Sequence, residues 1–176
     1  REILPKYDIK VSFVDGSSDV VLDNTYPVYM FKFINIHPET NTTKLQINAS
    51  ADTGSNYNVT KTTTYFQAYH TESDSATALQ YYANRDLAQS TSAQQLKDIG
   101  NTSDDSAAGT LHLFNPSSTT FVKHFIANFN NYHESDITQN YYIAGYANTT
   151  SAVNALQFSF GSGNIDAGDI CLYGIN

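Results

Sequence analysis

The sequence has no tryptophan, a single cysteine and only nine lysine and arginine residues among its 176. One cysteine excludes an internal disulfide and any zinc site built from several cysteines. Cys171 lies between Ile170 and Leu172, so we expect a buried, unreactive thiol. The formal net charge of -8 leaves no basic patch for phosphate backbones, and we therefore expect no binding to DNA or RNA.

Long apolar runs are missing as well. No stretch approaches the length of a membrane span and no signal peptide opens the chain, so we expect no membrane insertion. Charged residues make up only 15% of the chain, which leaves a surface made mainly of Asn, Ser, Thr and Tyr. Such a surface suits hydrogen-bonded contact with sugars or with protein neighbours.

Aromatic residues are abundant, with 13 Tyr and 10 Phe, and hydrophobic residues make up 40% of the chain. This fraction is enough for a core, and a chain of this length fits one domain over residues 1–176. Aromatic and β-branched residues favour pleated strands, whereas Asn and Ser favour turns. We therefore predict an all-β, single-domain protein.

Alternation of polar and apolar residues predicts the strands. The pattern is cleanest over 44–51, and we expect the next strand, 62–70, to pair with it as a hairpin around a turn at 52–56. Further strands are predicted at 28–36, which we expect to be buried on both faces, and at 121–129, 137–147, 153–160 and 168–175. Short strands separated by Gly, Asn and Ser turns predict a jelly-roll-like antiparallel β-sandwich. We place Phe158, Phe160 and Leu172 in its core.

The stretch 72–108 is the least regular part of the sequence. Residues 79–87 fit a strand or a loop, and residues 92–99 fit a short helical turn that ends at Gly100. We expect one long irregular excursion from an edge of the sandwich, and long connections of this kind are often functional or disordered.

No motif in the sequence indicates catalysis or metal binding. The five histidines are isolated, without an H-E-x-x-H or H-x-H pair, so we expect surface or hydrogen-bonded roles for His37, His70, His112, His124 and His133. The acidic clusters lie beside Gly, Ser or Asn, and we expect them to bond local turns: Asp15, Asp19, Asp23, Asp104, Asp105, Asp166 and Asp169. We therefore expect no enzyme, no catalytic residue, no cofactor and no metal.

Tyrosine pairs are the most informative surface feature. Where two tyrosines are adjacent on a strand, one ring points inward and the other outward. An outward ring stacks on sugars or anchors a protein interface, whereas cross-strand packing is the alternative for any single ring. The candidate contact surface comprises Tyr65, Tyr69, Tyr81, Tyr82, Tyr141 and Tyr142.

Three stretches resemble a family of structural proteins of tailed phages, especially marine and cyanobacterial ones. The ending NALQFSFGSGNIDAGDICLYGIN, residues 154–176, is similar to a closing hairpin in which an apolar strand and an SGN-I-xxG turn lead to LYGI. Residues 29–57 resemble the family's aromatic strand, I-x-P-x-T corner and S-x-D-x-G-x-x-Y turn. GTLHLFNPSS followed by Lys123 resembles its G-x-L-x-L-x-N-P element.

In the closing hairpin, Gly161, Gly163 and Gly168 allow a tight reversal with a bulge. Gly174 allows a neighbouring backbone or aromatic ring to approach closely.

The resemblance implies a virion protein on the exterior of a capsid or tail. The leading hypothesis is a capsid decoration or cement protein, or a head-fibre subunit, that acts by protein–protein contact with other virion proteins. The alternative is a tail-fibre receptor-binding domain that holds a host surface glycan, and the third hypothesis is a polysaccharide-degrading enzyme with paired carboxylates. We expect a homo-oligomer, and a homotrimer by analogy with threefold virion fibres.

Overall fold

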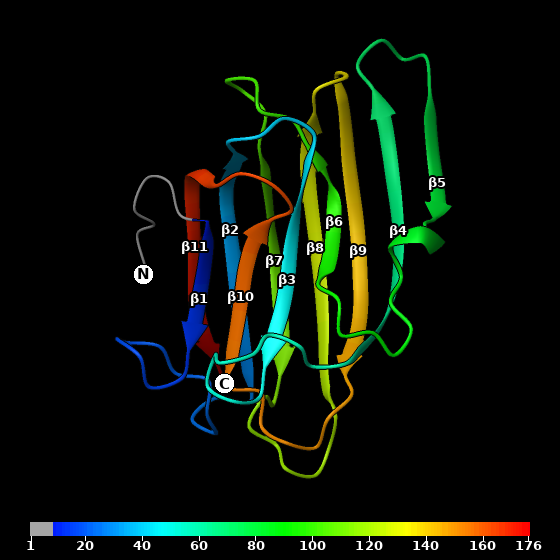
Figure 1. Ribbon diagram of the computed structural model, residues 1–176. Helices are drawn as coiled ribbons and strands as arrows, with labels where there is room; N and C mark the ends of the chain where they lie inside the picture. The colour runs from blue at the N-terminus through cyan, green and yellow to red at the C-terminus, as the bar shows by residue number, and fades with distance from the viewer. Residues whose placement is uncertain (1–8) are drawn as a thin grey trace.

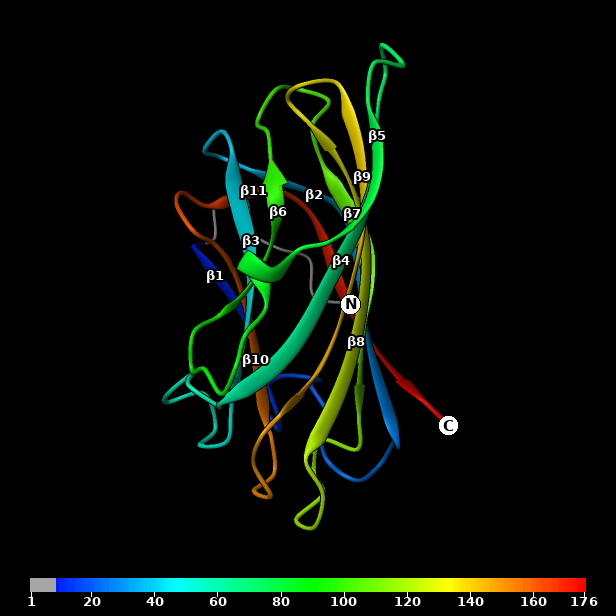
Figure 2. The ribbon, with the colours of Figure 1, turned by 90° about the vertical axis from the view of Figure 1, so that its right-hand side faces the viewer.

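The computed structural model describes residues 9–176, in which eleven strands form two antiparallel sheets packed face to face (Figures 1 and 2). The four-stranded sheet has the order β1-β10-β3-β6, and the seven-stranded sheet has the order β11-β2-β7-β8-β9-β4-β5. The bounds are β1 Lys10–Val14, β2 Val28–Pro38, β3 Thr43–Ser50, β4 Lys61–Thr71, β5 Thr77–Tyr81, β6 Gln94–Ile99, β7 Ala107–Phe114, β8 Lys123–His133, β9 Ile137–Ala147, β10 Ala155–Phe160 and β11 Ile165–Ile175. The predicted all-β sandwich is confirmed.

The strand order is that of a jelly roll with additions. Without β8, β9 and β11, the two sheets reduce to β1-β10-β3-β6 and β2-β7-β4-β5, and consecutive strands from β1 to β4 alternate between the sheets. The β8–β9 pair extends the sheet between β7 and β4, and β11 adds an edge beside β2. The only helix within residues 9–176 is the short 3-10 turn η1, Ala83–Arg85, which is too short to span a membrane.

The core lies between the sheets, and its centre is aromatic. Phe158 of β10 is completely buried, and its ring centroid lies 5.9, 5.2 and 5.0 Å from those of Phe13, Phe31 and Phe33. Alternate residues of each strand point into this core, as the period-two pattern requires. Phe160 is buried as predicted, whereas Leu172 is half-buried against the rim of the core.

Two predicted strand pairings are wrong, because the strands concerned lie in different sheets. β3 belongs to the four-stranded sheet and β4 to the seven-stranded sheet, so the turn at 52–56 begins a crossover and not a hairpin. Asp52 organises this turn by accepting hydrogen bonds from the Ser50 hydroxyl and the Asn56 backbone N–H, at 2.6 and 2.8 Å. These bonds lower the pKa of Asp52 to about 2.

The closing segment is a crossover too. β10 pairs with β1 and β3, whereas β11 pairs with β2 in the other sheet. The expected bulge is present: the register of β11 shifts twice between Ile165 and Asp169, where Gly168 has a φ of 106°. A side chain at Gly174 would collide with the ring of Tyr26, so the expected close approach of an aromatic ring is confirmed.

The stretch 72–108 is more regular than predicted. It contains β5, the turn η1 and β6, and it crosses from the free edge of the seven-stranded sheet to the free edge of the four-stranded sheet (Figure 1). The helical turn predicted at 92–99 is wrong, because Gln94–Ile99 pairs with β3 as an antiparallel strand. Strand β2 likewise differs from its prediction, since its burial alternates and only one face is covered.

A lysine lies in the interior between the sheets. Lys61, at the start of β4, is 3% exposed, and its Nζ donates to Asn48 Oδ1 at 2.6 Å and to the Val59 carbonyl at 2.8 Å. Both partners are uncharged, and no carboxylate of residues 9–176 forms an ion pair with Lys61. Burial therefore lowers the pKa of Lys61 to about 8.

We expect Lys61→Met to remove a pH dependence of stability. The folded-state pKa of about 8 lies below the ordinary 10.5, so the unfolded chain binds more protons between these values. The free energy of unfolding of the unchanged protein should therefore rise with pH across this window, relative to the variant. Urea denaturation of both proteins near pH 7 and pH 10 measures the difference, and Lys10→Met, at an exposed site, is the control. An unchanged slope in Lys61→Met would contradict the assignment.

Candidate functional site

The structure separates the six tyrosines of the candidate contact surface. Tyr65 and Tyr141 are completely buried on the inner face of the seven-stranded sheet, so their assignment to a contact surface is wrong. Their rings stack on each other, with centroids 5.6 Å apart. In β4 and β9 the odd-numbered residues, which include both tyrosines, point inward and the even-numbered residues point outward. The alternation in the sequence does not by itself show whether the odd-numbered or the even-numbered residues face the core.

The adjacent pairs behave as expected, with one ring outward and one inward. Tyr142 and Tyr81 are 44% and 59% exposed, respectively. Tyr82 packs against the core instead, and Lys97 Nζ lies 4.7 Å from its ring centroid. Tyr69 is half-buried on the inner side of β4. Of the six predicted residues, only Tyr81 and Tyr142 are therefore outward-facing and well exposed.

Strand register places these two tyrosines in one row with a residue that sequence reasoning missed. Phe66 of β4 is opposite Tyr81 of β5 and Tyr142 of β9. Its ring stacks on that of Tyr142 with a centroid distance of 5.1 Å and an interplanar angle of 13°. Phe66 is 43% exposed, so the three rings form an aromatic row open to solvent across three strands.

The aromatic row belongs to a larger surface, here called the uncharged face. It consists of the even-numbered residues of β7, β8, β9 and β4 and the odd-numbered residues of β5, and none of these is Asp, Glu, Lys or Arg. Leu79 and Ile126 also lie on it, 76% and 49% exposed. In Figure 2 it is the outer side of the layer that contains β8 and β4, away from the four-stranded sheet.

A shallow hollow of about 430 Å³ lies on the uncharged face beside the aromatic row. It is lined by residues of β4, β8 and β9, among them Thr62, Ile126, Ala144, Gly145 and Tyr146. A side chain at Gly145 would meet the Thr62 carbonyl oxygen at 2.5 Å, so glycine keeps the neighbouring strands in close contact there. A flat apolar surface with a hollow is a suitable shape to accept a protruding side chain from another protein.

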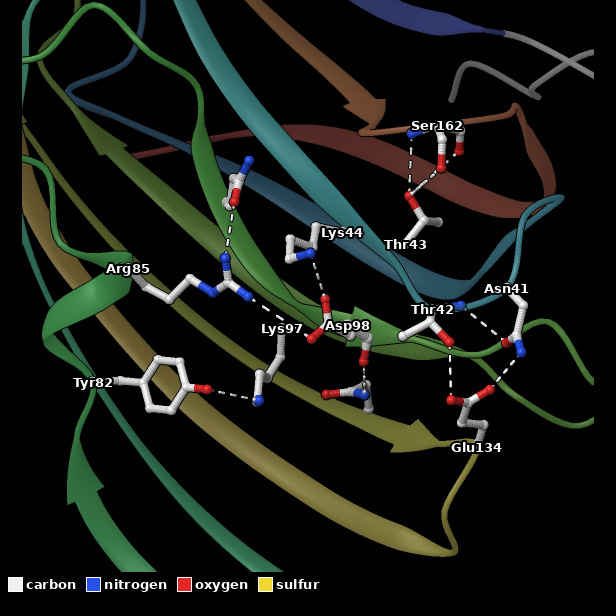
Figure 3. Close-up of polar contacts among 12 residues, drawn as sticks. Asn41, Thr42, Thr43, Lys44, Tyr82, Arg85, Lys97, Asp98, Glu134 and Ser162 are labelled. Carbon is white, nitrogen blue, oxygen red and sulfur yellow. Dashed lines mark hydrogen bonds and ion pairs between the residues drawn. The ribbon is translucent and has the colours of Figure 1, made fainter.

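A cluster of polar contacts holds β6 in place (Figure 3). The Asp98 carboxylate of β6 forms ion pairs with Lys44 Nζ at 3.0 Å and with the Arg85 guanidinium at 3.8 Å. Arg85 also donates a hydrogen bond to Gln95 Oε1 at 2.9 Å.

Glu134 lies in the turn between β8 and β9. Its carboxylate accepts hydrogen bonds from Thr42 and Asn41, and so ties this turn to the chain before β3. The Asp98 and Glu134 carboxylates are therefore both engaged in holding neighbouring segments of the chain together.

Several other titratable groups have local partners. Asp15 and Asp23 accept hydrogen bonds from the backbone N–H groups of Leu22 and Thr25, as predicted for turns. Asp166 and Asp169 lie in β11, however, and their placement in a turn is wrong. Asp166 bonds His37, and although burial opposes it, this bond raises the pKa of His37. Within residues 9–176, no three His, Cys, Asp or Glu residues are grouped so that they could hold a metal ion.

Cys171 is free and buried, as expected from its apolar neighbours.

Each of the two sheets has a broad outer surface. Exposed aromatic and aliphatic side chains gather on the uncharged face, which is the outer surface of the seven-stranded sheet. No protein-family model, curated protein or solved structure matches the chain.

Proposed function

We propose that this protein is a non-enzymatic structural protein of a phage virion that acts by protein–protein contact through the uncharged face. Its place is the exterior of the particle, as a capsid decoration or cement protein or a head-fibre subunit, and it associates as a homotrimer. The observation that carries the contact function is the set of exposed hydrophobic residues on a face without formal charge. The virion assignment rests on the resemblance of residues 154–176, 29–57 and the GTLHLFNPSS element.

The composition of the uncharged face supports a protein interface. The cores of interfaces are depleted in charged residues and enriched in Tyr and Phe, whereas a soluble surface normally carries Lys and Glu. Phe66, Tyr81, Tyr142, Leu79 and Ile126 expose apolar area on four strands. Large contiguous apolar patches mark interaction sites, because their exposure to water is unfavourable.

Strand β5 adds a second reason for a neighbour at this surface. It is the free edge of the seven-stranded sheet, and its sequence TALQY contains neither a charge nor a proline. Edge strands are normally protected by charges, proline or bulges, because an open edge pairs with other chains. A partner that covers the uncharged face at β5 would protect this edge and bury Leu79 and Tyr81.

Two of the carboxylates that could support catalysis are engaged with cations or with a histidine. Asp98 is bracketed by Lys44 and Arg85, and Asp166 is bonded to His37. Hydrolysis of a glycoside requires two carboxylates that flank one cleft, one of them as an acid. The partners of these carboxylates favour a binding protein over the polysaccharide-degrading alternative.

The test is the protein content of purified virions of the phage that encodes the chain. We expect mass spectrometry to detect the protein in particles purified by density gradient, and gold-labelled antibodies to mark the capsid exterior. Antibodies against a non-structural protein of the same phage are the control. Absence of the chain from purified particles would contradict the virion assignment, and labelling of the tail alone would move it to the tail-fibre alternative.

A further inference from the structure

The four-stranded sheet has a groove that is separate from the uncharged face. It has a volume of about 780 Å³ and lies on the outer side of β10 and β3, which are neighbours in the front sheet of Figure 1. One end is bounded by the turn Gly161–Gly163 and the other by the turn that includes Asn56 and Tyr57. A groove of this size lies within the range of small-molecule sites, about 300–1,000 Å³.

The floor of the groove is made of amides and hydroxyls. In the antiparallel register Gln46 is opposite Ser159, and Asn48 is opposite Gln157. The side chains of Gln46 and Ser159 accept or donate no hydrogen bond within residues 9–176, and both are partly exposed to the groove. They therefore offer two neighbouring polar groups that are free to bond a ligand.

We propose that this groove binds a neutral oligosaccharide. Planar amides and hydroxyls match the alternating donors and acceptors of sugar hydroxyl groups, and the half-buried ring of Tyr57 offers an apolar contact at one end. Lys10 is the only charged residue among those that line the groove within the described chain. A polyanionic ligand would need several cations there, so the chemistry favours an uncharged glycan.

The same residues favour binding without cleavage. None of the described residues that line the groove is Asp or Glu, and glycoside hydrolysis needs such carboxylates. A bound peptide is disfavoured because the backbones of β3 and β10 are already paired with each other, so no free strand edge lies on the floor. Glycan binding is also independent of assembly through the uncharged face, because the two surfaces lie on opposite sheets.

The test is binding of the full chain to an array of neutral and uronic-acid-containing polysaccharides, followed by titration calorimetry with an oligosaccharide of the neutral glycan that binds best. We expect Gln46→Ala combined with Ser159→Ala to weaken binding by about tenfold, because each substitution removes a neutral hydrogen bond. The matched control is Gln80→Ala combined with Ser103→Ala, at exposed sites outside the groove, and should leave affinity unchanged.

Three results would overturn the groove as a neutral-glycan site. They are the absence of any neutral glycan among those bound, binding that the Gln46 and Ser159 substitutions leave intact, and preferential binding of a peptide library. A groove variant that loses glycan binding but keeps the oligomeric mass of the unchanged protein separates this site from the assembly surface.

Discussion

Phe158→Ala is expected to lower the free energy of unfolding by about 3–5 kcal/mol. Phe158 is completely buried at the centre of the sandwich, where its ring touches phenyl rings from both sheets. Alanine removes these contacts and leaves a cavity that the sheets cannot fill without moving apart. For a domain of this size each kcal/mol corresponds to about 2–4 °C in Tm, so thermal denaturation followed by circular dichroism detects the effect easily.

Phe121→Ala is the matched control for this core substitution. Phe121 is 69% exposed, so the same deletion of a phenyl ring should change stability by less than about 0.5 kcal/mol. Equal losses in the two variants, or a Phe158→Ala variant as stable as the unchanged protein, would show that Phe158 is not the centre of the core.

Phe66→Lys is expected to abolish self-association. Phe66 lies in the middle of the aromatic row, between Tyr81 and Tyr142, and the outward strand residues around it include no Asp, Glu, Lys or Arg. The Asp86 carboxylate beside the row already accepts a hydrogen bond from the Tyr81 hydroxyl. A lysine there would be buried in the interface without a partner, and an unpaired buried charge costs about 3–5 kcal/mol. This corresponds to a rise in the dissociation constant of roughly a hundredfold or more. Light scattering at micromolar concentration should give a trimer mass for the unchanged protein and a monomer mass for the variant.

Phe121→Lys provides the control, because it adds the same charge at an exposed site outside the uncharged face. It should keep the trimer mass. Circular dichroism should show that both lysine variants are folded, since neither side chain is buried in the monomer. If Phe66→Lys retains the mass of the unchanged oligomer, the uncharged face does not mediate assembly.

Much of the fold could be predicted from local patterns. The strand predicted at 137–147 coincides with β9, and 153–160 and 168–175 overlap β10 and β11, because apolar alternation is a local property of a half-buried strand. Strand partners depend on long-range packing. A turn around Gly54 is compatible with both a hairpin and a crossover, and only the packing of the two sheets decides between them.

Less of the candidate site could be predicted from the sequence. Because Tyr141 and Tyr142 are adjacent on one strand, the sequence shows that one ring points inward and the other outward. Which of the two is buried depends on which side of the sheet the core covers, and the structure shows that it is Tyr141. The aromatic row combines residues from three strands whose register is non-local, so Phe66 has no sequence signal that links it to Tyr81 or Tyr142. The uncharged set of outward residues becomes recognisable once the inward tyrosines identify the covered face.

A density map of the assembled oligomer tests the central claim most directly, because it shows which sheet each protomer presents to its neighbours. We predict that the uncharged face, including Phe66, Tyr142 and Ile126, is buried against the neighbouring protomer or an adjacent virion protein. The groove on β3 and β10 should remain open to solvent in the same map. An assembly in which the seven-stranded sheet faces solvent and protomers meet through other surfaces would contradict the account.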